Sequence, residues 1–140
     1  MAYPVEVQKA YQAALEAREK AYAPYSKYHV GAAVKWHGRE KVFSGCNVEN
    51  SSYGATVCAE RIAIFNSITE QGAGQIEFFV LVTENLAGPC GMCLQVMSEF
   101  ADGKMPVYLG DLEGLQKKCA FEEFLPTAFD KEMLPAFQNK

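Results

Sequence analysis

Hydrophobic and polar residues alternate along this chain in patterns that change several times. Apolar side chains recur at helical spacing over residues 7–22, and Ala23-Pro24 ends the pattern because a residue before proline avoids helical backbone angles. Residues 28–36 then alternate between apolar and polar, which is typical of a half-buried strand, and a His-Gly turn leads to a second strand at 41–44. This part of the chain predicts a helix followed by a β-hairpin.

The rest of the chain switches between helical and extended patterns. The predicted helices cover residues 58–71, 92–100 and, briefly, 121–126, and the predicted strands cover residues 76–83, 106–109 and 115–120. Strands joined by helices in this order predict an α/β fold, a three-layer α-β-α sandwich around a mixed sheet of about five strands. No repeat or linker interrupts the series, so we expect one domain over residues 1–140.

Composition narrows the function classes. Hydrophobic residues make up 49% of the 140, which fits a folded protein, and the net charge of -4 leaves no basic surplus for binding polymeric nucleic acid. The longest strongly apolar run, Phe78 to Val82, is far short of the roughly 18 residues of a membrane helix. The N-terminus lacks the pattern of a secretory signal, so we expect a cytoplasmic protein with no membrane partner. In that reducing compartment, its five cysteines favour metal binding, catalysis or burial over disulfides.

Three of the cysteines begin two predicted helices. Cys90 and Cys93 are three positions apart, so both sulfurs fall on one helix face, and Cys58 can complete a tripod from the other helix. Three thiolates bind one Zn²⁺ and leave a fourth position for water, as in a catalytic site. Glu60 lies too close in sequence to Cys58 to be a comfortable ligand, but it can point at that water as a proton shuttle. The pattern therefore predicts a catalytic zinc site.

The charges around such a site also fit. Both cysteine clusters are placed at helix N-termini, whose partial positive charge favours thiolate over thiol. Zn²⁺ and three thiolates sum to one net negative charge, and Arg61 can offset part of it by donating to a sulfur. Taken singly, Cys46 and Cys119 are better explained as core residues, and His29 and His37 as structural.

Cys-x-Glu followed by Pro-Cys-x-x-Cys is the all-cysteine form of the zinc deaminase signature. Further segments, in order along most of the chain, make the sequence resemble the small homotetrameric cytidine deaminases. The matching segments are 23–33, 45–50, 58–61, 89–96 and 125–129. The resemblance implies hydrolysis of cytidine and 2′-deoxycytidine to uridine and 2′-deoxyuridine in pyrimidine salvage. One zinc ion per chain would supply a hydroxide that attacks C4, and Glu60 would carry the proton to N3 and then to ammonia.

The same resemblance implies roles for further residues of this chain. Asn47 and Glu49 would hold the ribose 3′-hydroxyl, Ala55 would offer its backbone to the pyrimidine, and Tyr28 would lie against the base. Arg61 and Gln95 would support the zinc ligands from behind. Tyr53 and Phe129 would reach the pocket of a neighbouring subunit in a homotetramer.

This chain departs from the family pattern beside the zinc ligands. Leu94 stands where the family usually has Arg, Gly88 where it has Ser, and Tyr28 where Phe is common. The first two changes predict a wider leaving-group pocket, with an N4- or C4-substituted cytidine as an alternative substrate. The competing expectation is that the lost arginine charge only raises the pKa of the zinc-bound water and the pH optimum. A blasticidin-like nucleoside, the substrate of related deaminases, is a further alternative. A redox dithiol at Cys90 and Cys93 and a non-catalytic zinc module are the other classes. A redox dithiol does not need the Cys58-x-Glu60 pair, and a non-catalytic zinc module needs neither Glu60 nor an open coordination position.

Overall fold

The computed structural model describes residues 2–138, which contain five strands and three longer helices. In chain order these elements are α1 (Val5–Arg18), β1 (Gly31–Trp36), β2 (Val42–Cys46), α2 (Ala59–Gln71), β3 (Ile76–Val82), α3 (Gly91–Ser98), β4 (Pro106–Gly110) and β5 (Leu115–Ala120). The short helical turn η1 (Tyr53–Ala55) lies between β2 and α2, and η2 (Phe121–Glu123), η3 (Lys131–Met133) and α4 (Pro135–Gln138) follow β5.

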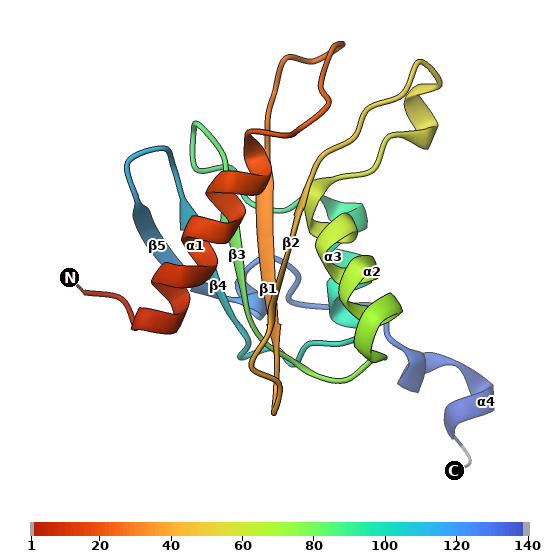
Figure 1. Cartoon of the computed structure of the whole chain (residues 1–140). Helices are drawn as coiled ribbons and strands as arrows, with labels where there is room; N and C mark the ends of the chain where they lie inside the picture. Colours follow the sequence, from red (N-terminus) through yellow and green to blue (C-terminus); the bar gives the residue numbers. More distant parts are fainter. Residues whose placement is uncertain (1, 139–140) are drawn as a thin grey trace.

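The strands form one mixed sheet in the order β2-β1-β3-β4-β5. β3 and β4 are parallel, with Leu81 opposite Leu109, and the other neighbours are antiparallel. Figure 1 shows α1 on one face of the sheet and α2 and α3 on the other. This arrangement confirms the predicted α-β-α sandwich.

Side chains that alternate along the strands divide the core into two layers. Ala33, Val80 and Tyr108 pack against α1, whereas their neighbours Ala32 and Leu81 pack against α2 and α3. Because β3 is covered on both faces, its sequence is apolar almost throughout. One face of β3 thus packs against α2 and α3, the helices at which the candidate site lies.

The first predicted helix was too long, because α1 ends at Arg18 and not at residue 22. Tyr22 instead exchanges backbone hydrogen bonds with the segment after β2: its N–H donates to the carbonyl of Asn47 and its carbonyl accepts from the N–H of Glu49. These tertiary bonds replace the helical ones that the periodicity favours.

The first strand was also predicted too early and the last helix too long. β1 begins at Gly31, because the Asn47 side chain binds the backbone of Tyr28 and Val30 and takes the place of a strand ladder there. The helix expected over 121–126 is reduced to the single turn η2. Within residues 2–138, no helix is both long and apolar enough to cross a membrane.

Candidate active site

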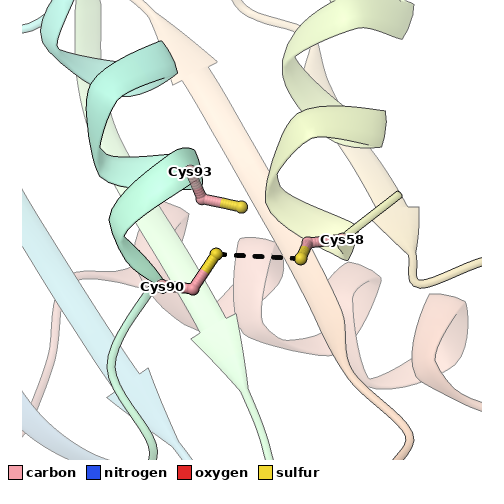
Figure 2. A group of neighbouring side chains, drawn as sticks. All are labelled: Cys58, Cys90 and Cys93. Atoms are coloured by element: carbon pink, nitrogen blue, oxygen red, sulfur yellow. Dashed lines mark hydrogen bonds between the residues drawn. The ribbon is translucent and has the colours of Figure 1, made fainter. Parts of the chain in front are cut away.

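Three cysteines converge where α2 and α3 begin. Cys58 is the residue before α2, Cys90 is the residue before α3, and Cys93 lies in the first turn of α3. Their Sγ atoms all lie within 4.8 Å of one another, and those of Cys58 and Cys90 are 3.9 Å apart. Figure 2 shows the three sulfurs pointing toward one common centre. Tetrahedral zinc with Zn–S bonds of about 2.3 Å separates two sulfurs by about 3.8 Å, so the donor set and its spacing fit zinc.

The surroundings of the cluster favour one thiolate, at Cys58. The hydrogen bond from the Cys93 thiol is the main cause that lowers the pKa of Cys58 to about 5, and Arg61 contributes by donating from Nη2 to Sγ over 3.7 Å. The pKa of Cys93 is raised in turn, because this thiol gives its hydrogen bond to Cys58 and is buried beside its negative charge. Without a metal the two sulfurs share a proton, which a bound zinc ion would displace.

Glu60 lies in the first turn of α2 and is buried, with 4% of its surface exposed. Burial is the main cause that raises the pKa of its carboxyl to about 7, and the negative charge of Cys58 adds to the effect. A carboxyl with a pKa near neutrality can both accept and release a proton at physiological pH. Its environment therefore suits the proton shuttle that the sequence predicts.

A cavity of about 260 Å³ opens beside these groups. It brings together Tyr28, Asn47, Glu49, Glu60 and two of the cysteines, which come from segments far apart in the sequence. The complete lining is Ser26, Tyr28, Val30, Asn47, Glu49, Thr56, Cys58, Glu60, Leu81, Thr83, Ala87, Gly88 and Cys90. The third cysteine, Cys93, is fully buried behind the cavity wall.

Asn47 and Glu49 already have partners in the chain. The Nδ2 of Asn47 donates to the carbonyl of Tyr28 over 2.8 Å, and its Oδ1 accepts from the N–H of Val30 over 2.9 Å. Glu49 accepts from the N–H of Tyr25 and from both the N–H and the hydroxyl of Ser26. The hydroxyl of Ser26 is the main cause that lowers the pKa of Glu49. Both side chains therefore shape the loop that forms one cavity wall.

Known protein families and sequences were compared with this chain. A family model described as the cytidine and deoxycytidylate deaminase zinc-binding region matches residues 4–109. The chain belongs to this family. A cytidine deaminase of Sporosarcina psychrophila is 42% identical over 132 residues, which span 93% of this chain and 96% of the relative. One of Halalkalibacterium halodurans is also 42% identical, over 85% of this chain and 90% of the relative.

Solved structures of deaminases share the fold. The crystal structure of cytidine deaminase from Burkholderia pseudomallei matches with a TM-score of 0.80 and 42% identity, over 86% of this chain and 97% of that one. Cytidine deaminase from Mycobacterium tuberculosis matches with a TM-score of 0.73 and 32% identity, over 90% and 98% of the two chains. The resemblance seen in the sequence is confirmed, and so are cytidine deaminase as the enzyme class and zinc as the cofactor.

Other residues that the deaminase resemblance implicates do not line the cavity of their own chain. Tyr53 and Phe129 are 75% and 57% exposed. Ala55 belongs to η1, where its N–H donates to the carbonyl of Ser52, and the neighbouring Thr56 lines the cavity instead. Gln95 is exposed and its Nε2 donates to the carbonyl of Phe129 over 2.7 Å, so it fastens the C-terminal segment to α3.

The structure does not support a wider pocket at the two departures beside the zinc ligands. Leu94 is buried in the core between the sheet and its helices, and it is not part of the cavity wall. Gly88 does line the cavity, but a side chain at this position would project toward the ring of Phe124. Leu94 is therefore not a wall residue, and the space left by the missing Cβ at Gly88 faces Phe124.

Sequence reasoning missed two polar residues next to the cavity. Thr83 is buried at the end of β3, and its Oγ1 accepts from the N–H of Ala87. The sequence could have indicated Thr83, because it is a polar residue directly after an apolar strand, where ligands often bind. Asn85 accepts a hydrogen bond from the hydroxyl of Tyr28, which lies 57 positions away in the sequence, and no local sequence pattern predicts such a contact.

Proposed function

We propose that this chain hydrolyses cytidine and 2′-deoxycytidine to uridine and 2′-deoxyuridine in the cytoplasm, as part of pyrimidine salvage. One observation carries the proposal: the buried Glu60, with a pKa raised to about 7, shares a cavity with two thiols of the three-cysteine cluster and with polar groups suited to a nucleoside. The relatives named cytidine deaminase, 42% identical over most of the chain, support the same substrate.

The proposed reaction uses one water molecule and releases one ammonia. A zinc ion held by Cys58, Cys90 and Cys93 would supply a water acidic enough to attack C4 of the pyrimidine at neutral pH. Glu60 accepts the first proton of that water and delivers it to N3. It then takes the second proton from the hydroxyl added at C4 and delivers it to the amino group, which leaves as ammonia. Burial of Glu60 keeps bulk water from competing for these protons.

The other groups would bind and orient the nucleoside. Tyr28 would pack against the base, and Asn47 and Glu49 would hold the ribose 3′-hydroxyl at the cavity mouth. The backbone of Ala55 would meet the pyrimidine. Arg61 would hold the Cys58 thiolate, and Gln95 would fix the segment that carries Phe129. These roles support a free nucleoside as substrate.

We propose that the chain acts as a homotetramer of single-domain subunits. The exposure of Tyr53 and Phe129 supports this, because large aromatic rings on a surface mark contact sites with other molecules. In the tetramer these rings would close the cavity of a neighbouring subunit.

The test is to mix the purified protein with cytidine, follow the ultraviolet change to uridine, and measure zinc per chain. We expect turnover of cytidine and 2′-deoxycytidine with about one zinc ion per chain. CMP, N4-methylcytidine and blasticidin S serve as competing substrates. Zinc-loaded protein that turned over any of these faster than cytidine would contradict the proposal, as would comparable turnover of CMP.

A further inference from the structure

The ring of Tyr28, which lines the cavity, is held at both ends. The backbone N–H of Tyr28 donates to the hydroxyl of Ser26 over 3.0 Å, and its backbone carbonyl accepts from the Asn47 side chain over 2.8 Å. At the far end of the ring, the hydroxyl donates to Oδ1 of Asn85 over 2.5 Å. The preceding residue, Lys27, has a left-handed backbone with φ 61°, so the turn that presents the ring has a defined shape. The position of the ring is therefore set by backbone contacts and by one bond at its tip.

Asn85 is exposed, but it belongs to a well-defined loop between β3 and α3. The Thr83 hydroxyl accepts from the N–H of Ala87 over 2.8 Å and closes the loop across Asn85. Leu86 has a left-handed backbone with φ 59°, which a leucine adopts only when its surroundings require it, and its side chain packs against the core. These contacts give Asn85 a fixed base from which to hold the Tyr28 hydroxyl.

We propose that Asn85 is a positioning residue for the pyrimidine, acting through the hydroxyl of Tyr28. The proposal rests on the proposed function, in which the Tyr28 ring packs against the base. A ring fixed before the substrate arrives loses less freedom on binding, so the bond increases affinity without touching the nucleoside. A phenylalanine could not make this bond, because it has no hydroxyl to donate.

The same bond also connects the cavity wall to the loop that leads to Cys90. Asn85 lies five positions before that cysteine, on the segment that includes the cavity residues Ala87 and Gly88. The alternative role for the bond is only to stabilise this loop and the fold. The two roles differ in what they change, because positioning of the ring affects substrate affinity and loop stability affects melting and zinc retention.

The test compares the zinc-loaded variants Asn85→Ala, Tyr28→Phe and the double variant with the unmodified protein. Each single change should raise KM for cytidine and weaken calorimetric binding of uridine about fivefold, the effect of one net hydrogen bond. The value of kcat should stay within about twofold, because the loss lies in binding and not in the transition state alone. The double variant should lose no more than either single one, since both changes break the same bond.

Two further variants distinguish the effect of the accepting oxygen at position 85 from a general effect of changing this turn. Asn85→Asp retains an oxygen that can accept from the Tyr28 hydroxyl, so it should restore KM to near the unmodified value. Glu84→Gln changes the exposed neighbour in the same turn and should leave KM unchanged. Melting temperature and zinc content should be similar for all variants, because Asn85 is at the surface.

Additive losses in the double variant would overturn the proposal, and so would an unchanged KM or a fall in kcat that follows zinc loss. The proposed function fails separately. If the unmodified protein binds uridine but does not deaminate cytidine, the catalytic proposal is wrong, while the uridine affinities of the variants still decide the role of Asn85.

Discussion

The ring carbon Cε1 of Phe124 lies 2.9 Å from the point where a side chain at Gly88 would begin. Carbon atoms do not approach one another so closely without contact strain, so the absence of a side chain at 88 makes room for this ring. Phe124 follows the turn η2, and it packs against the core. The departure from the family at Gly88 is therefore explained by packing.

Gly88→Ser should destabilise the protein by about 1–3 kcal/mol, the usual cost of overpacking. The Phe124 ring must shift, and the strain should loosen the segment before Cys90, so zinc should be lost to a chelator faster. Gly91→Ser is a matched control in the same motif, because a side chain there meets nothing within 4 Å. Phe124→Leu added to Gly88→Ser should restore stability. A Gly88→Ser protein with unchanged melting temperature and zinc release would contradict this account.

The sequence was informative where chemistry depends on neighbouring positions. The spacing of Cys90 and Cys93 within one helical turn sets their relative placement, and Glu60 follows Cys58 on the same helix, so this part of the site could be predicted. The pairs Tyr28–Asn85 and Gly88–Phe124 could not, because each depends on how two loops fold against one another.

Errors in the predicted elements have the same origin. The helical pattern through Tyr22 is real, but bonds to Asn47 and Glu49 outweigh it once β2 is in place. The alternation that begins at Tyr28 reads as a strand, but the Asn47 side chain occupies the backbone groups that a neighbouring strand would need. Local periodicity carries no information about such distant partners.

Phe129→Ala should raise KM for cytidine several-fold and leave zinc content and melting temperature unchanged. The ring is 57% exposed, so its removal costs its own subunit little stability, whereas a neighbouring cavity would lose a contact with the base. Steady-state kinetics measure KM, metal analysis and thermal melting measure zinc content and stability, and sedimentation measures the oligomeric state. An active monomer with unchanged KM would contradict shared sites.

Mixed tetramers give a sharper form of this test. Phe129→Ala subunits retain Glu60, and Glu60→Gln subunits retain Phe129. A mixed assembly contains sites with both groups only if each site draws Phe129 from a neighbour. Phe129→Ala alone has a high KM, and Glu60→Gln alone has almost no turnover. Co-refolded subunits should therefore show fast turnover with a low KM, and turnover only at the KM of Phe129→Ala would count against sharing.

Glu60→Gln should retain the fold and the zinc ion but lose activity by about 10²–10⁴-fold or more, since an amide cannot carry the proton. The loss should appear in kcat, measured by the ultraviolet change on cytidine. Glu40→Gln, at an exposed site, is the control for removing one carboxylate. Turnover of Glu60→Gln within tenfold of the unmodified protein would exclude Glu60 as the proton shuttle.

Glu60→Gln should lower activity but increase stability at alkaline pH, because the charged Glu60 carboxylate is unfavourable in its buried position. In the metal-free protein, burial raises the pKa of Glu60 from 4.5 to about 7, so the folded state binds this proton more tightly than the unfolded state. Stability then falls as pH rises through that interval, at a cost on the order of 3 kcal/mol above pH 7. Glu60→Gln removes the titrating group, so it should be more stable than the unmodified protein at pH 8 and show little difference at pH 4.5. Urea unfolding of the metal-free proteins at both pH values measures this, with Glu40→Gln as control. A gain at pH 8 that persisted undiminished at pH 4.5 would show that the cost comes from packing around the side chain and not from its charge.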